Sequence, residues 1–334
     1  MVSIPYKSYA FQAMKITVFC LLVTYLCRLM GASNQVLLVS FYMAVLTALG
    51  TFSVTQKQLS HVILGGVVIG GSLLVGAVLD FYYPIPAKLL AILYSGLAFY
   101  LPTKQYQSNI YITGSITFLI FSILPFTFAD AITYAPYCLG VFVIFILFHL
   151  LFDSIGSRNL KDQIIRKLEV HRNHSTAVIA VSALFFSWLI GFYLSSYHHV
   201  PQIYWIELTA LVVVAGARPS QNAIQTSIKR MLACTMAAVI IVFLFNNILP
   251  MIFWLNIAIL TVFLFFIFFL QFNYLWKVLF TELFVLAITY LLGDHKERVI
   301  FARVILTGIG GLIVIITTWI VEYVFRRLYR CHKG

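Results

Sequence analysis

Charged residues are scarce in this sequence. Only 10% of its 334 residues are charged and just 10 are acids, whereas 62% are hydrophobic. About a quarter of the residues in an ordinary water-soluble domain are charged, so this composition excludes that class. Apolar runs separated by short polar links indicate instead a protein that crosses a membrane many times.

The sequence also lacks the patterns of several site types. Its five cysteines are scattered, without disulfide or metal-ligand spacing, so we expect no metal and no cofactor. No phosphate-binding loop motif is present, which argues against ATP hydrolysis by this chain. No cluster of His, Asp or Ser suits catalysis, so we expect no enzyme, and a lipid-modifying membrane enzyme is the least favoured class.

The apolar segments predict an all-α polytopic membrane protein of about twelve transmembrane helices. The first six spans are expected at residues 16–30, 35–51, 62–80, 86–101, 110–124 and 134–152. The second six are expected at residues 175–194, 203–217, 231–245, 251–270, 276–292 and 304–320. Thr47-Ala48-Leu49 and Thr209-Ala210-Leu211 occupy corresponding spans, which indicates two parallel six-helix repeats.

The predicted organisation has four parts. Residues 1–152 form the first six-helix half and residues 175–325 the second. Residues 153–174 form a cytoplasmic linker, expected as an amphipathic surface helix because its apolar residues fall on one side; a plain solvated connector is the alternative. Residues 326–334 form a basic cytoplasmic tail.

The net charge of +12 is unevenly distributed along the chain. With the N-terminus inside, most lysines and arginines fall on the cytoplasmic side, Arg218 and Arg230 among them, whereas Arg298 and Arg303 fall outside. Positive charge therefore predicts membrane topology and contact with lipid, and not a nucleic-acid partner. Both termini are expected in the cytoplasm.

Two acids within the apolar segments, Glu207 and Glu282, are candidates for proton coupling or substrate binding. A charge at bilayer depth is costly, so such residues usually face a cavity or an oppositely charged partner. The alternative for Glu282 is a structural ion pair with Lys277 or with an arginine of a neighbouring helix. The alternative for Glu207 is an acid at the membrane interface.

Basic residues flank a proline-broken loop in the second half of the chain. Arg218, Lys229 and Arg230 are expected at its inner mouth, where they could attract an organic anion. Arginine suits bidentate contact with a carboxylate; ordinary positive-inside topology is the alternative. Arg303 is expected on the outer side, against the topological bias, and is the better candidate for an anion contact.

One order of residues around this loop is distinctive: Tyr204-Trp205, Thr209-Ala210-Leu211, Pro219-Ser220, Arg230 and Thr235. It resembles the core signature of the fusaric acid resistance (aromatic acid exporter) family. Near the C-terminus, Arg303 followed by Thr307-Gly308 and Gly310-Gly311 resembles the closing helix of that family.

The chain departs from the family pattern at three points. Cys234 stands where glycine is usual, and Glu207 stands where an apolar residue is more usual. The large cytosolic domain of longer members is absent between the two halves, which leaves open any regulation through that domain.

The resemblance implies an inner-membrane efflux transporter for small organic acids, aromatic or amphipathic, driven by the proton gradient. Members of the family work with a haemolysin-D-type periplasmic adaptor and an outer-membrane channel, which implies a Gram-negative inner membrane. The alternative is a non-transporting structural or assembly partner of an envelope complex. Whether the chain forms a homo-oligomer stays open.

Overall fold

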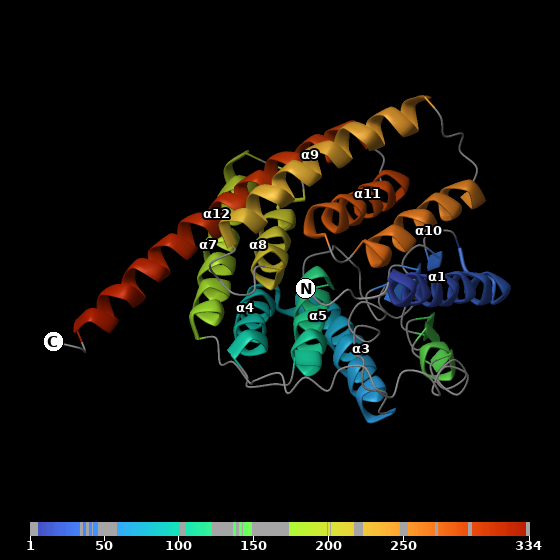
Figure 1. Ribbon diagram of the computed structural model, residues 1–334, viewed down its shortest axis with the longest axis horizontal. Coiled ribbons are helices and arrows are strands. Elements are labelled where there is room, and N and C mark those ends of the chain that lie inside the picture. The colour runs from blue at the N-terminus through green and yellow to red at the C-terminus, as the bar shows by residue number, and fades with distance from the viewer. Residues whose placement is uncertain are drawn as a thin grey trace. The chain divides into compact units, whose positions relative to one another are not determined.

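Every secondary-structure element in the described part of the chain is an α-helix (Figure 1). This computed structural model describes residues 6–33, 36–37, 40–41, 43–45, 59–100, 105–121, 136–137, 140–141, 143–148, 174–198, 200, 202–216, 223–247, 253–270, 273–292 and 296–331. The prediction of an all-α protein is therefore confirmed for these residues. Within the described residues, four helical segments are long and apolar enough to cross a membrane: Ile63–Tyr82, Ser175–His198, Ala223–Leu244 and Ile300–Val324.

The helices keep the labels of Figure 1. In the first part of the chain they are α1 (Tyr6–Leu29), α3 (Leu59–Tyr82), α4 (Pro84–Tyr100) and α5 (Gln105–Phe121). In the second part they are α7 (His174–His198), α8 (Tyr204–Gly216), α9 (Ala223–Asn247), α10 (Phe253–Phe269), α11 (Tyr274–Leu292) and α12 (Lys296–Cys331).

Each of these helices overlaps one of the expected spans. The expected spans 35–51 and 134–152 and the predicted linker 153–174 fall largely outside the described residues. The motif Thr47-Ala48-Leu49 falls wholly outside them. Twelve spans in two repeats thus stay a prediction. The first residues of the predicted basic tail continue α12 as far as Cys331.

The described helices group into two compact units. In the unit formed by Val18–Asn173, α5 packs against α3 and α4. A Cβ atom added at Gly114 of α5 would lie 2.7 Å from Cγ1 of Val68, so only glycine allows this close approach. Ser72 of α3 donates a hydrogen bond to the Tyr94 hydroxyl of α4 across 3.3 Å.

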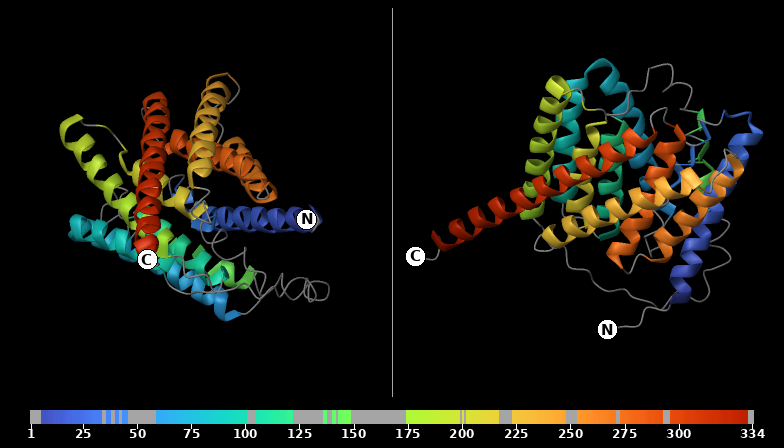
Figure 2. Two further views of the ribbon diagram at one scale, coloured as in Figure 1. Left: turned by 60° about the vertical axis from the view of Figure 1, so that its left-hand side comes forward. Right: turned by 90° about the horizontal axis from the view of Figure 1, so that it is seen from above.

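The other unit comprises Met1–Thr17 and His174–Gly334. Its organising element is α12, which packs against α7, α8 and α9, while α11 packs against α9 and α10. Figure 1 shows α9 and α12 side by side. The C-terminal part of α12 extends beyond the other helices of this unit (Figure 2).

Local sequence explains where two of the helices begin or end. After α1, Gly31 adopts the left-handed φ of 80°, and the amides of Gly31 and Ala32 donate back to the carbonyls of Arg28 and Cys27. This pairing is how a glycine ends a helix. At the start of α11, Oδ1 of Asn273 accepts from the Leu275 amide at 3.1 Å, as an N-cap residue does.

Two helices begin earlier than the sequence predicted. α9 begins at Ala223, not at 231, and α12 begins at Lys296, not at 304. Arg230 and Arg303 therefore lie about two turns inside their helices, and the prediction that they flank the spans was wrong. Their charges made them look like span boundaries, but each is buried against a counterion.

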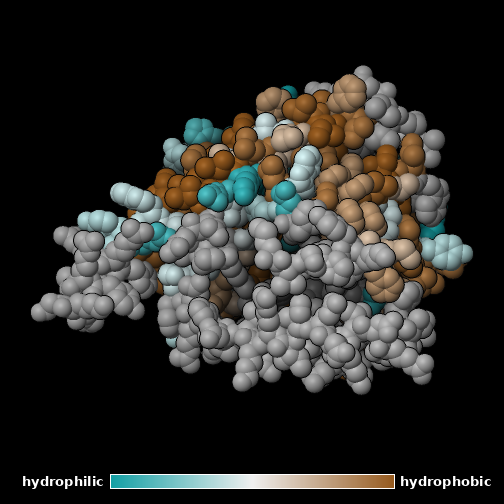
Figure 3. Space-filling model, in the orientation of Figure 1, coloured by the Kyte–Doolittle hydropathy of each residue, from teal (hydrophilic) through white to brown (hydrophobic). Residues whose placement is uncertain are grey.

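The helices of the second part of the chain expose wide apolar surfaces (Figure 3). α9 and α12 present bulky hydrocarbon side chains outward: Leu232, Met236, Val239, Phe243, Ile305, Leu312, Ile316 and Trp319. Such a surface is costly in water but is the normal lipid-facing side of a membrane helix. It supports the interpretation of a multi-pass membrane protein.

Candidate functional site

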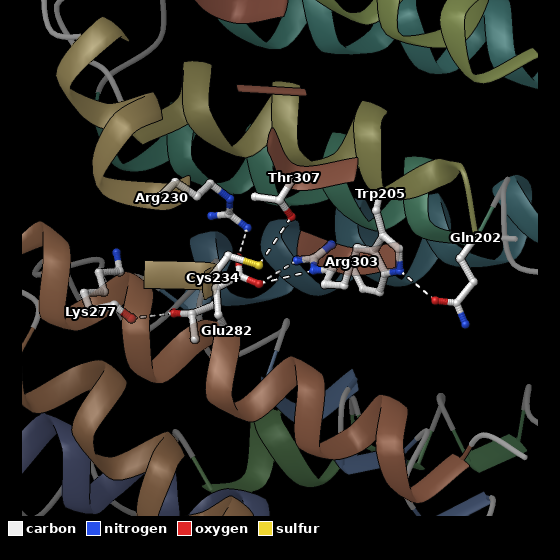
Figure 4. Close-up of polar contacts among 9 residues, drawn as sticks. Gln202, Trp205, Arg230, Cys234, Lys277, Glu282, Arg303 and Thr307 are labelled. Atoms are coloured by element: carbon white, nitrogen blue, oxygen red, sulfur yellow. Dashed lines mark hydrogen bonds and ion pairs between the residues drawn. The ribbon is translucent and has the colours of Figure 1, made fainter. Parts of the chain in front are cut away.

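Three helices each contribute one charged side chain to a buried cluster (Figure 4). Glu282 of α11 is fully buried, and Arg230 of α9 and Arg303 of α12 are 3% and 1% exposed. One carboxylate oxygen of Glu282, Oε1, lies 2.5 Å from an Arg230 nitrogen. The other, Oε2, accepts hydrogen bonds from Nη2 of Arg303 at 2.8 Å and from its Nε at 3.3 Å.

Trp205 packs against the Arg303 side of the cluster. The guanidinium carbon of Arg303 lies 3.4 Å from the centre of the Trp205 ring, on α8, which is a close cation–π contact. The indole nitrogen of Trp205 donates to Oε1 of Gln202 at 3.0 Å. Gln202 precedes α8 and has a φ of 57°, in the left-handed region. This backbone conformation places the Gln202 side-chain oxygen where it accepts from the Trp205 indole.

Close packing of α12 against α8 and α9 brings these side chains together. A Cβ atom at Gly310 would lie 2.7 Å from the Ile206 carbonyl oxygen, and one at Gly311 would lie 3.1 Å from the Met231 sulfur. Nearer the cluster, the Cys234 thiol of α9 donates to the Thr307 hydroxyl of α12 at 3.5 Å. Small residues at this helix crossing thus allow the two arginines to reach one carboxylate.

The comparisons with known proteins agree with this location. Residues 176–317 match the family described as fusaric acid resistance protein-like. The chain is similar to that family over this region. No curated protein and no solved structure matches the chain.

The fusaric acid resistance-like region contains the whole cluster, together with Gln202 and Trp205. The suspected family is therefore confirmed over that region. This similarity supports a membrane transporter-like protein rather than an enzyme. Among the residues that the structure describes, no group of His, Cys, Asp or Glu side chains is placed to hold a metal ion.

The structure brings three of the five predicted site residues together: Arg230, Glu282 and Arg303. They had been assigned to different positions, Arg230 at the inner mouth of the loop and Arg303 on the outer side. Since both contact the same carboxylate, their assignment to opposite sides of the membrane was wrong. The alternative of an arginine partner for Glu282 is the arrangement that the structure shows.

The two remaining candidates are Glu207 and Arg218. Glu207 is buried at 4% exposure in α8, and both of its interpretations, a functional acid and an acid at the membrane interface, stay predictions. Arg218 lies outside the described residues. Its predicted anion contact stays a prediction.

Sequence reasoning missed the roles of three cluster neighbours: Trp205, Cys234 and Thr307. Trp205 and Thr307 lie among the residues that carry the family resemblance, which was the available signal, whereas Cys234 is a departure from the family pattern. How close these residues lie to Arg230 and Arg303 depends on how α8, α9 and α12 pack. The residue pattern within a single helix does not reveal this packing.

The cluster is electrostatically unbalanced. Two guanidinium groups face one carboxylate, so the three side chains carry one net positive charge away from water. A buried charge without a partner is expensive. An arrangement of this kind can attract and hold an anion, and the aromatic ring beside it offers an apolar contact.

Proposed function

We propose that the chain is an inner-membrane efflux transporter for small organic acids, aromatic or otherwise amphipathic, and that Arg230 and Arg303 contact the carboxylate of the substrate. The observation that carries this proposal is the buried, net-positive cluster of Arg230, Glu282 and Arg303 inside the fusaric acid resistance-like region. Arginine binds carboxylates through paired, directional hydrogen bonds. Trp205 beside Arg303 suits an acid that also carries an apolar or aromatic group.

The proton gradient is the proposed driving force, with Glu207 and Glu282 as the groups that could exchange a proton. Glu282 is engaged by both arginines, so a proton would reach it only after the cluster opens. Glu207 is the other carboxyl known to be buried among the described residues of this region. We also propose a haemolysin-D-type periplasmic adaptor and an outer-membrane channel as partners, with both termini of the chain in the cytoplasm, on the basis of similarity to the family alone.

Accumulation of labelled benzoate in cells that express the chain with a candidate adaptor tests this function. We expect lower accumulation than in cells without the chain, loss of that difference with a protonophore, and a reduced difference for Arg303→Ala. Arg298→Ala is the matched control because Arg298 is exposed on the same helix. Unchanged accumulation across a panel of organic acids, at matched expression, would refute export.

A non-transporting partner of an envelope complex is the second candidate. The observation that favours it is that the same ion pairs join α9, α11 and α12, and so would stabilise a purely structural bundle. On this alternative, Arg303→Ala lowers the thermal stability of the purified protein and changes no solute accumulation at matched expression.

A further inference from the structure

We propose that Glu282 sets the charge of the ligand: the cluster accepts one singly charged anion and discriminates against a doubly charged one. This inference rests on the proposed function and narrows its substrate class. It depends on two features of the cluster, its unused hydrogen-bond donors and its net charge.

The first feature is that each arginine has one side-chain nitrogen without a hydrogen bond to the described residues. Arg303 uses Nε and Nη2 on Glu282, whereas its Nη1 has no hydrogen-bond partner among the described residues. The same holds for Nε of Arg230. Both side chains are more than nine-tenths buried, and a buried unpaired donor is costly unless something accepts from it. The Tyr274 hydroxyl lies beside Arg230 and can accept from it, so the acceptor that a ligand or water can supply is the one for Nη1 of Arg303.

Two further hydroxyls that are unpaired among the described residues lie near α12, one on α8 and one on α9. The hydroxyls of Thr209 and Ser227 are fully buried and have no partner within the described part of the chain. They flank the positions of Gly310 and Gly311, which are about 10 Å from Arg303 along α12. Because the helices are closely packed at Gly310 and Gly311, we count these hydroxyls as unpaired polar groups and not as contacts of the ligand.

The second feature is the charge count. Glu282 neutralises one of the two arginines, which leaves one positive charge. A monoanion brings the cluster to neutrality, a dianion leaves it negative, and a neutral acid leaves it positive. Since uncompensated charge away from water is strongly unfavourable, the monoanion is preferred. Replacing Glu282 by a neutral residue raises the cluster to two positive charges and shifts the preference to a dianion.

Equilibrium dialysis of the purified full-length protein against labelled benzoate and labelled terephthalate tests this inference. The two probes share one ring and differ by one carboxylate. For the wild-type protein we expect benzoate to bind at least about tenfold more tightly. For Glu282→Gln we expect this ratio to fall by at least about tenfold or to reverse. Glu322→Gln, an acid-to-amide change further along α12, should leave the ratio as it is.

A second variant covers the case in which Glu282→Gln does not fold. Arg230→Gln leaves the Glu282–Arg303 pair neutral, so benzoate binding should weaken by at least about tenfold. An unchanged ratio in folded Glu282→Gln, or full benzoate binding by Arg230→Gln, would overturn the inference while leaving the proposed function intact. Binding of neither probe by the folded wild-type protein would count against the proposed function itself.

Discussion

The two units of the chain treat buried polar side chains differently. In the Val18–Asn173 unit, the buried hydroxyls of Ser95 and Ser115 donate to carbonyls of their own helix, at 2.8 Å and 2.9 Å. In the other unit, Thr209 and Ser227 lack such a partner among the described residues, and three charged side chains meet in the interior. Every described buried side-chain atom without a hydrogen-bond partner belongs to this second unit.

This difference distinguishes buried polar side chains that hydrogen-bond within the fold from buried polar side chains that keep an unused hydrogen-bonding group. A hydroxyl that bonds its own helix backbone costs little and needs no ligand. A buried donor without an acceptor costs free energy, and such groups persist where something else supplies the acceptor. The comparison therefore favours the unit with the Arg–Glu–Arg cluster as the place where the chain binds its ligand.

The largest effect is expected from Glu282→Leu. This change leaves two guanidinium groups buried without a counterion, and the loss of one partner from a buried ion pair costs about 3–5 kcal/mol. Thermal unfolding of the detergent-solubilised protein measures it. Ser115→Ala, at a fully buried hydroxyl of the other unit, should cost less than about 1 kcal/mol. Equal losses of stability in Glu282→Leu and Ser115→Ala would contradict the difference between the two units.

Close helix packing provides the next test. A Cβ at Gly310 would meet the Ile206 carbonyl oxygen at 2.7 Å, and a Cβ at Gly114 would meet Val68 at the same distance. Overpacking of this kind costs about 1–3 kcal/mol, so Gly310→Ala and Gly114→Ala should lower thermal stability similarly. Only Gly310→Ala should also weaken benzoate binding, because it displaces α12 from α8 and with it Arg303 from Trp205.

Gly308→Ala is the matched control for these variants. A Cβ at Gly308 meets nothing within 4 Å, and alanine is the better helix former, so stability should be unchanged or slightly higher. If Gly308→Ala lost as much stability as Gly310→Ala, the cause would be added side-chain bulk anywhere in this stretch. The close approach of Gly310 to the Ile206 carbonyl would then not explain the loss.

The sequence predicted the helical class and the candidate charges because both depend on local signals. A carboxyl such as Glu282 within an apolar segment can be recognised from the sequence alone. Which charge it meets is not visible, because the partner is decided by helix packing. Arg230 and Arg303 were assigned to opposite membrane sides by a rule about loops, and that rule does not apply to an arginine about two turns inside a helix.

The stack of Arg303 on Trp205 should have a moderate effect. Trp205→Leu keeps an apolar side chain but removes the ring, and a desolvated cation–π contact contributes about 2 kcal/mol. Benzoate binding should weaken by roughly tenfold. Arg303→Lys should also weaken binding, because a lysine keeps the charge but cannot make paired contacts with Glu282 and a ligand. Equilibrium dialysis measures both, and wild-type affinity in Trp205→Leu would contradict the role of the stack.

The smallest effect is expected at Gln202, which acts on the arginine only through the tryptophan. Gln202→Gly relieves the left-handed backbone but loses the acceptor for the Trp205 indole. These two effects are each of the order of 1 kcal/mol and oppose one another, so thermal stability should barely change. Benzoate binding should nevertheless weaken slightly, because Trp205 is no longer held against Arg303. Gln202→Asn, which tolerates the same backbone and keeps an amide oxygen, should fall between glycine and the wild type. The reverse order of affinities would mean that the backbone at Gln202, and not its side chain, positions Trp205.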